Sequence, residues 1–150
     1  MDFFGPIAYI SIGGNKYGLV IIDDFSRFTW VFFLQDKSEV QGIVKKFIWR
    51  AQNEYELKIM HVRSDNGLEF QNTNVEKFLD EEGIKHEFSA SYTPQQNGIV
   101  ERKNRTLIEA ARTMLDEYKT PDSFWAEAIN TACHAINRLY IYKYLGKTPY

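Results

Sequence analysis

The sequence predicts a single α/β domain with a mixed sheet flanked by helices. Short β-branched and aromatic runs alternate with longer segments whose apolar residues recur at helical spacing. No repeat, low-complexity stretch or Pro/Gly/Ser-rich linker divides the 150 residues, so residues 1–150 are expected to form one domain. Hydrophobic residues make up 44% of the chain and aromatic residues 15%, which is enough for a packed core.

The predicted elements begin with a first strand that ends at Asp2, followed by a hairpin. The hairpin strands are residues 16–23 and 28–34, KYGLVIID and FTWVFFL, on either side of a short turn. Runs so rich in β-branched and aromatic residues are typical of largely buried strands.

A capped helix follows the hairpin. Asp36 or Ser38 can serve as its N-cap, and Glu39 lies three residues after Asp36, as in a capping box. Apolar residues then recur at helical spacing, which predicts a helix that runs to about Tyr55. These apolar residues are Ile43, Val44, Phe47 and Ile48.

The middle of the chain predicts two further strands and a short helix. Residues 58–64, KIMHVRS, form a strand that ends at Asp65. Residues 75–82 predict a helix that closes at Gly83, a residue suited to a left-handed C-cap. Residues 85–89 predict one more short strand.

A polar loop and two helices complete the predicted fold. Residues 90–97, ASYTPQQN, are polar and contain proline, which predicts a mobile loop. Residues 98–118 have a strongly helical pattern, Pro121 interrupts the chain, and residues 123–139 predict a final amphipathic helix.

The cysteine and histidine content excludes several kinds of site. Cys133 is the only cysteine, which rules out an internal disulfide and a cysteine-based zinc site. His61, His86 and His134 are scattered, so a structural zinc is not expected; His86 has no assigned role. No apolar run is long enough to cross a membrane, and we expect a soluble domain in a reducing compartment with no membrane partner.

The net charge of −2 leaves the partner undecided. Residues 97–150 carry eight Lys/Arg and six Asp/Glu, whereas residues 1–96 carry ten and fourteen. A carboxylate-rich site that takes up divalent cations would offset part of the negative charge.

Three acidic residues occupy positions where a site is expected. Asp2 and Asp65 end predicted strands, and Glu101 lies early in the long helix after the loop. Acidic groups at the ends of neighbouring strands meet at one edge of a sheet, and a helix packed there can add a third. Three such carboxylates raise one another's pKa unless a cation bridges them, and Mg²⁺ prefers oxygen ligands of this kind. The spacing of thirty-five residues between Asp65 and Glu101 is not specific by itself.

The residues around these acids carry a more specific signal. The relevant segments are MDFFGP (1–6), IDDFSR (22–27), VRSDNGLEF (62–70), SYTPQQNGIVERKNR (91–105) and FWAEAINTACHAINR (124–138). Together they resemble the core domain of retroviral and retrotransposon integrases, with the copia-type retrotransposon branch the most similar. This resemblance implies a ribonuclease H-like fold with a five-stranded mixed sheet flanked by helices, its first strand truncated, in a fragment of a longer polyprotein.

The resemblance also implies an activity. Asp2, Asp65 and Glu101 match the Asp-Asp-Glu triad that binds Mg²⁺ or Mn²⁺, two ions in all, and they are the expected catalytic and metal-binding residues. The family hydrolyses the end of the element's DNA, and the freed 3′-hydroxyl then attacks a target phosphodiester in one step. The expected partners are DNA and further copies of the chain, as a dimer or a higher oligomer. The expected location is intracellular, in the nucleus or a cytoplasmic virus-like particle.

Two groups of residues beside the triad are expected to contact DNA. The first is the basic cluster on the long helix, where phosphate contacts position DNA without reading its sequence: Arg102, Lys103 and Arg105. Arg105 lies one turn beyond Glu101 and shares its face. The second group lies in the loop that in the family moves over the DNA end: Tyr92, Gln95, Gln96 and Asn97.

Other interpretations of the same residues remain open. Asp65 can serve the Asp-Asn-Gly turn itself, and Glu101 can be a first-turn helix acid favoured by the helix dipole. Asp23 and Asp24 are rivals for the first acidic position, although an acidic pair at a hairpin turn commonly serves the turn. Glu69 is a solvated acid or a partner that orients nearby groups. The whole chain can also be a non-catalytic DNA-binding or dimerising module, or a ribonuclease H-type nuclease.

Overall fold

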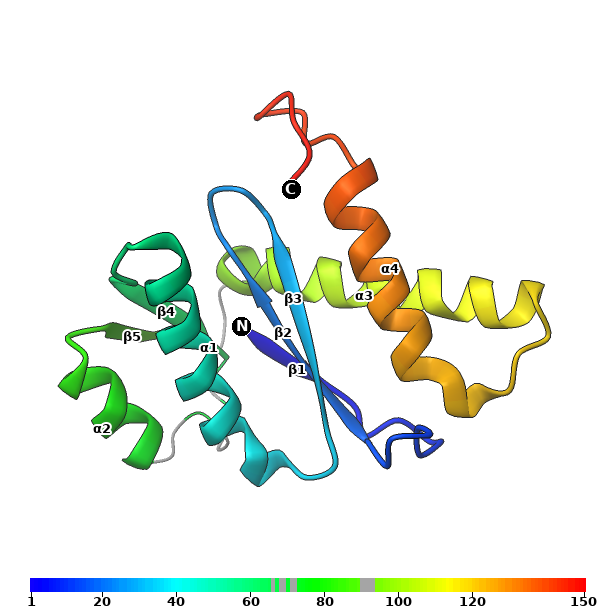
Figure 1. Ribbon diagram of the computed structural model, residues 1–150, viewed down its shortest axis with the longest axis horizontal. Helices are drawn as coiled ribbons and strands as arrows, with labels where there is room; N and C mark the ends of the chain where they lie inside the picture. Colours follow the sequence, from blue (N-terminus) through cyan, green and yellow to red (C-terminus); the bar gives the residue numbers. More distant parts are fainter. Residues whose placement is uncertain (66, 68–69, 71–72, 90–93) are drawn as a thin grey trace.

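A computed structural model of the chain describes all residues except 66, 68–69, 71–72 and 90–93 (Figure 1). The structure is of the α/β class, as the order of motifs predicts. Among the described residues, no helix has the length and apolar character needed to cross a membrane.

Three strands form the central antiparallel sheet in the order β1 (Asp2–Phe4), β2 (Tyr17–Ile22) and β3 (Thr29–Leu34). The predicted hairpin is therefore confirmed. Asp2 pairs with Val20 and Phe4 with Gly18, so Asp2 is the first residue of β1. The prediction that a strand ends at Asp2 is wrong, because the backbone stays extended and paired with β2 through Phe4.

The other two strands form a separate parallel pair, β4 (His61–Ser64) and β5 (Lys85–Phe88). Within the described residues the strands thus make a three-stranded and a two-stranded sheet, in place of the single five-stranded sheet expected from the resemblance. The Met1 ammonium donates to the Arg63 carbonyl at 2.6 Å, which bridges the end of β1 and β4. One such bond is not a ladder, because a ladder needs successive backbone pairs along both strands.

The helix after the hairpin has the predicted cap. A short 3₁₀ turn (Lys37–Glu39) leads into α1 (Val40–Tyr55). The Asp36 carboxylate accepts from the Ser38 amide at 2.8 Å, and the Glu39 carboxylate accepts from the Asp36 amide at 2.8 Å. This reciprocal pair of bonds is the predicted capping box and satisfies donors that a helix start otherwise leaves free.

The remaining helices are α2 (Thr73–Glu81), α3 (Pro94–Glu117) and α4 (Trp125–Leu139), the last preceded by a 3₁₀ turn (Asp122–Phe124). Residues 94–97 were expected in a loop, but they form the first turn of α3. The reason is that proline fits the first turn of a helix, where its missing N–H has no partner to lose. Residues 90–93, the rest of that predicted loop, lie outside the described part of the chain.

Helices cover both faces of the central sheet (Figure 1). Alternate side chains of β2 divide between two cores, because successive strand residues point to opposite faces. Leu19 packs in one core with residues of α1 and α2, and Val20 packs in the other with residues of α3 and α4. Both side chains are fully buried. This layering places α3 beside β1, where Asn104 contacts Asp2, and so positions the candidate site.

Candidate metal centre

Asp2, the first of the three predicted acids, is held by two hydrogen bonds. Its Oδ1 accepts from the Phe3 amide at 2.9 Å, and its Oδ2 accepts from the Asn104 Nδ2 at 2.8 Å. Asn104 lies on α3 and is 7% exposed. Asn104 was not among the site residues predicted from the sequence. The available signal was its position three residues after Glu101, which places both on one face of the helix.

The electrostatics of Asp2 show that the other two acids lie nearby. The pKa of Asp2 is raised to about 6, first by burial and next by the charge of Asp65, with a smaller contribution from Glu101. The Phe3 amide and the Met1 ammonium act in the opposite direction. Like charges that raise a pKa in this way are expected where several carboxylates share one site.

Asp65 follows β4 directly and lies in a turn. Its Oδ1 accepts from the Gly67 amide at 3.4 Å, the geometry of an Asx turn. The hydroxyl of Ser64 donates to the Asp65 carbonyl at 2.9 Å. Asp65 therefore takes part in the turn interpreted from the Asp-Asn-Gly sequence, and its metal-ligand role stays a prediction.

Glu101 is exposed on α3, one helical turn before the buried Asn104. Across the described part of the chain, no three His, Cys, Asp or Glu side chains are close enough to hold a metal ion. Charge effects on a pKa act over longer distances than a metal–oxygen bond of about 2.0–2.1 Å. The structure therefore brings Asp65 and Glu101 close enough for their charges to act on Asp2, but the three acids are not close enough to bind one metal ion together.

The chemistry of the donors fits a divalent cation. Carboxylate oxygens are the hard ligands that Mg²⁺ prefers. The Asn104 Oδ1 is a further oxygen at the site, and it is buried without a hydrogen-bond partner among the described residues. Buried acceptors are nearly always satisfied, so this oxygen is suited to a water or ion that joins the site.

Comparison with known proteins establishes the family. The family model described as integrase core domain matches residues 1–94. The chain belongs to this family. A Pol polyprotein from the tobacco transposon TNT 1-94 is 44% identical over 137 residues, which is 91% of this chain and 10% of that protein. A Pol polyprotein from the Arabidopsis thaliana transposon RE2 is 35% identical and matches 87% of this chain and 9% of that protein. The integrase core described here therefore spans about a tenth of the length of these relatives.

Solved structures share the integrase fold. The HTLV-2 integrase catalytic core domain in complex with magnesium, in a trimeric form, has a TM-score of 0.67 and 23% identity; the match covers 99% of this chain and 92% of that one. A simian T-cell lymphotropic virus intasome in complex with the PP2A regulatory subunit B56 gamma has a TM-score of 0.72 and 20% identity, and the match covers 99% and 52% of the two chains. At these identities the likeness supports the ribonuclease H-like fold.

The first group of predicted DNA contacts is the basic cluster on α3, and its three residues differ in exposure. Arg102 and Arg105 are exposed on α3, where a phosphate can reach them. Lys103 is only 6% exposed, and its ammonium donates to the Tyr142 hydroxyl at 2.8 Å. Residues two positions apart face roughly opposite sides of a helix, so Lys103 points away from Glu101 and towards the C-terminal segment. In this structure Lys103 does not have the exposure that its predicted DNA contact requires.

The second group of predicted contacts, and Glu69, are only partly described. Tyr92 and Glu69 lie outside the described residues. Gln95, Gln96 and Asn97 belong to the first turn of α3, but their side chains are not described. Their roles remain predictions.

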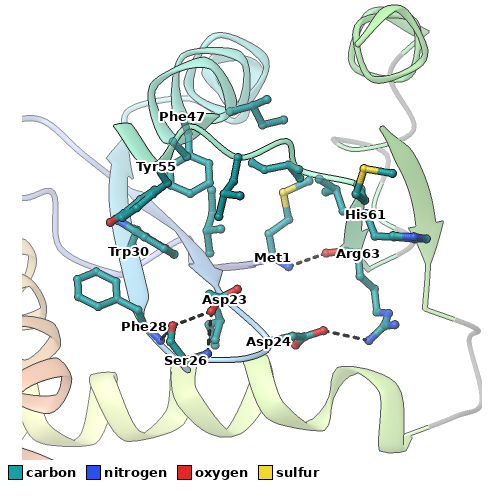
Figure 2. A pocket seen from close by; sticks show the side chains of 18 of the residues that line it. Met1, Asp23, Asp24, Ser26, Phe28, Trp30, Phe47, Tyr55, His61 and Arg63 are labelled. Atoms are coloured by element: carbon teal, nitrogen blue, oxygen red, sulfur yellow. Dashed lines mark hydrogen bonds and ion pairs between the residues drawn. The ribbon is translucent and has the colours of Figure 1, made fainter. Parts of the chain in front are cut away.

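The rival acids Asp23 and Asp24 are engaged by the hairpin turn. Asp23 accepts from the Ser26 amide at 2.7 Å and from its hydroxyl at 2.6 Å. Asp24 lies 3.5 Å from the Arg27 guanidinium and 3.7 Å from that of Arg63. Figure 2 shows both acids at one edge of a groove of about 960 Å³. Asp2, Asp65 and Glu101 do not line this groove themselves, but Met1 and Val100, the residues that precede Asp2 and Glu101, do.

Proposed function

We propose that this chain is the catalytic core of a retrotransposon integrase, a polynucleotidyl transferase that acts on DNA with a divalent metal ion. The observation that carries the proposal is the placement of Asp2, which Asn104 of α3 holds at 2.8 Å within reach of the charges of Asp65 and Glu101. The transposon Pol polyproteins support the class of element. The HTLV-2 core in complex with magnesium supports the choice of metal.

The proposed roles follow from the positions of the side chains. Asp2, Asp65 and Glu101 would hold Mg²⁺ or Mn²⁺, two ions in all, through their carboxylate oxygens. When bound, such ions polarise a phosphodiester and activate the attacking oxygen. Asn104 orients Asp2 by holding its Oδ2. Because Glu101 is on the exposed side of α3, it can turn towards Asp2 and Asp65 by a change of rotamer.

The proposed reaction has two steps at the same site. In the first, water attacks the phosphodiester near the end of the element's DNA, and the leaving oxygen becomes a free 3′-hydroxyl. In the second, this hydroxyl attacks a target phosphodiester, so that one P–O bond forms as another breaks. The exposed Arg102 and Arg105 would contact phosphates and position the DNA beside Glu101.

The proposed partners are element DNA, target DNA and further copies of the chain. The neighbouring structures include an integrase core in a trimeric form, a dimeric form and an intasome, which supports an oligomer. An intracellular location, in the nucleus or a virus-like particle, follows from the same proposal.

A disintegration assay tests the proposal. The chain is incubated with a branched DNA substrate in Mn²⁺, Mg²⁺ or EDTA, and resolution of the branch is followed on a gel. Asp65→Asn and Glu101→Gln are expected to abolish metal-dependent resolution. Two matched control variants, Asp80→Asn on α2 and Glu109→Gln on α3, change exposed acids of the same types and are expected to retain it.

One observation favours a second candidate function. The triad is not assembled among the described side chains, as expected of a DNA-binding or dimerising module that does not catalyse. Such a module binds DNA with a salt-dependent affinity but gives no resolution in any metal. Full activity of the Asp65→Asn or Glu101→Gln variant would contradict the catalytic proposal.

A further inference from the structure

A partly buried series of hydrogen bonds connects β5 to Asp65. The His86 Nε2 lies 2.9 Å from the Ser64 hydroxyl oxygen, and the same oxygen lies 2.9 Å from the Asp65 carbonyl. Ser64 is fully buried at the end of β4. His86 is on β5, where its ring packs against Phe88 with centroids 4.2 Å apart.

The Ser64 hydroxyl proton determines which group donates in each hydrogen bond between His86 and Asp65. A serine hydroxyl has one proton to donate and can also accept. Because the Ser64 proton goes to the Asp65 carbonyl, the bond from the imidazole must be donated by Nε2–H. The other ring nitrogen, Nδ1, is then the acceptor nitrogen; it is buried and has no partner among the described residues. The hydrogen bond from Nε2 to the Ser64 hydroxyl thus holds the His86 ring in place.

We propose that His86 is a positioning residue for Asp65, acting through the Ser64 hydroxyl on the backbone at the candidate metal ligand. The inference rests on the proposed function, because it takes Asp65 as a ligand. Asp65 is held from two sides: the Ser64 hydroxyl bonds its carbonyl, and the Gly67 amide bonds its Oδ1. Partners behind a metal ligand fix its orientation, and their loss weakens metal binding.

The position of His86 makes this role specific to the site. Val62 and His86 are register partners in the parallel pair, and the Ser89 amide donates to the Ser64 carbonyl at 2.9 Å. The backbone ladder therefore holds β4 and β5 together without the imidazole. The hydrogen bond from His86 instead acts at the last residue of β4, next to the turn that carries Asp65.

The test measures Mn²⁺ affinity at fixed pH, from the free Mn²⁺ signal in electron paramagnetic resonance. His86→Leu removes the donor, and His86→Gln keeps an amide N–H that can reach Ser64. Ser64→Ala removes the hydroxyl itself. The matched control is His61→Leu, since His61 lies on the neighbouring strand with an exposed ring 3.5 Å from Glu87. The melting temperature of each variant in EDTA is measured alongside.

His86→Leu and Ser64→Ala are each expected to weaken Mn²⁺ binding about tenfold. The double variant should lose no more Mn²⁺ affinity than either single variant, because both substitutions interrupt the same series of hydrogen bonds. His86→Gln should bind within about twofold of the unmodified chain, and His61→Leu should bind unchanged.

Unchanged Mn²⁺ affinity in Ser64→Ala or His86→Leu would overturn the inference, as would a His86→Gln variant as weak as His86→Leu. If His86→Leu does not fold, Ser64→Ala and His86→Gln still decide the question. An unmodified chain that binds no Mn²⁺ would contradict the proposed function itself, and the inference with it.

Discussion

The side-chain amide of Asn104 donates to the Oδ2 of Asp2 at 2.8 Å, across 102 positions of the chain. This bond joins α3 to β1 at Asp2, the first of the three predicted acids. It also leaves the Asn104 Oδ1 buried beside Asp2. Asn104 thus links the stability of the α3–β1 contact to the geometry of the site.

Replacing Asn104 should therefore affect metal binding. Asn104→Ala is expected to lower Mn²⁺ affinity about tenfold or more, because Asp2 loses the donor that orients it. It should also lower the free energy of unfolding by about 1–2 kcal/mol, the usual effect of losing a buried hydrogen bond. Calorimetric titration and urea unfolding measure these effects. Asn130→Ala, on the exposed side of α4, is the control, and equal Mn²⁺ affinity in the two variants would contradict the role of Asn104.

Asp2 should make the stability of the metal-free protein depend on pH. Its pKa in the folded state is about 6, above the ordinary value of 3.8, so the folded state holds the proton more tightly than the unfolded state. The contribution of Asp2 to stability is then full below about pH 4 and is lost as the pH rises through 6. In EDTA, Asp2→Asn should match the unmodified chain at pH 4 and exceed its stability at pH 7.5. With solvent screening the gain is on the order of 1 kcal/mol.

Thermal unfolding in EDTA across this pH range measures the difference. A divalent cation should reverse the order at pH 7.5, because it binds the Asp2 carboxylate and not the amide. A pH-independent difference between the two proteins would show that the raised pKa of Asp2 is not expressed in stability.

Two glycines should respond to alanine in opposite ways. A Cβ at Gly18 would clash with the ring of Phe4, its partner across β1 and β2, and most closely with the Phe4 Cζ. Phe4 is buried against Trp125, so Gly18→Ala is expected to cost about 1–3 kcal/mol of unfolding free energy. A Cβ at Gly42 in α1 meets no described atom within 4 Å, so Gly42→Ala should stabilise the protein by about 0.5–1 kcal/mol. Urea unfolding of both variants decides the signs.

Cys133 should be unreactive in the folded protein. It lies in α4 with 5% of its surface exposed, its thiol donates to the Thr29 carbonyl at 3.3 Å, and burial raises its pKa to about 11. The thiolate is the reactive form of cysteine. A disulfide reagent at pH 8 should therefore modify the native chain far more slowly than the chain unfolded in about 6 M urea. Equal rates would show that α4 does not protect the thiol.

The three basic residues after Glu101 should differ in their effect on DNA binding. Arg102→Ala and Arg105→Ala should each weaken DNA binding and reduce the dependence of the logarithm of affinity on salt by about one unit. Lys103→Met should leave this salt dependence unchanged and lower stability instead, because the ammonium contacts Tyr142 and not solvent. Fluorescence anisotropy at several salt concentrations measures the difference. A reduced salt dependence in Lys103→Met would mean that Tyr142 releases the side chain on DNA binding.

The sequence by itself determined the elements whose signals are local. The capping box of Asp36 and Glu39, the hairpin and the left-handed Gly83 depend on residues a few positions apart, and the structure confirms them. The motifs around Asp2, Asp65 and Glu101 were also enough to indicate the family, because the residues within each motif are adjacent in the chain.

Only the tertiary structure decided the contacts between distant segments. It showed that Asn104 holds Asp2, that Tyr142 takes up Lys103, and that Ser64 joins His86 to Asp65. For the residues that it describes, it also divided the strands into a sheet of β1, β2 and β3 and a pair of β4 and β5. The physical reason is that such contacts depend on how helices and strands pack and on the register of their pairing. A local pattern specifies which face of an element is apolar, but not which polar group meets it from another part of the chain.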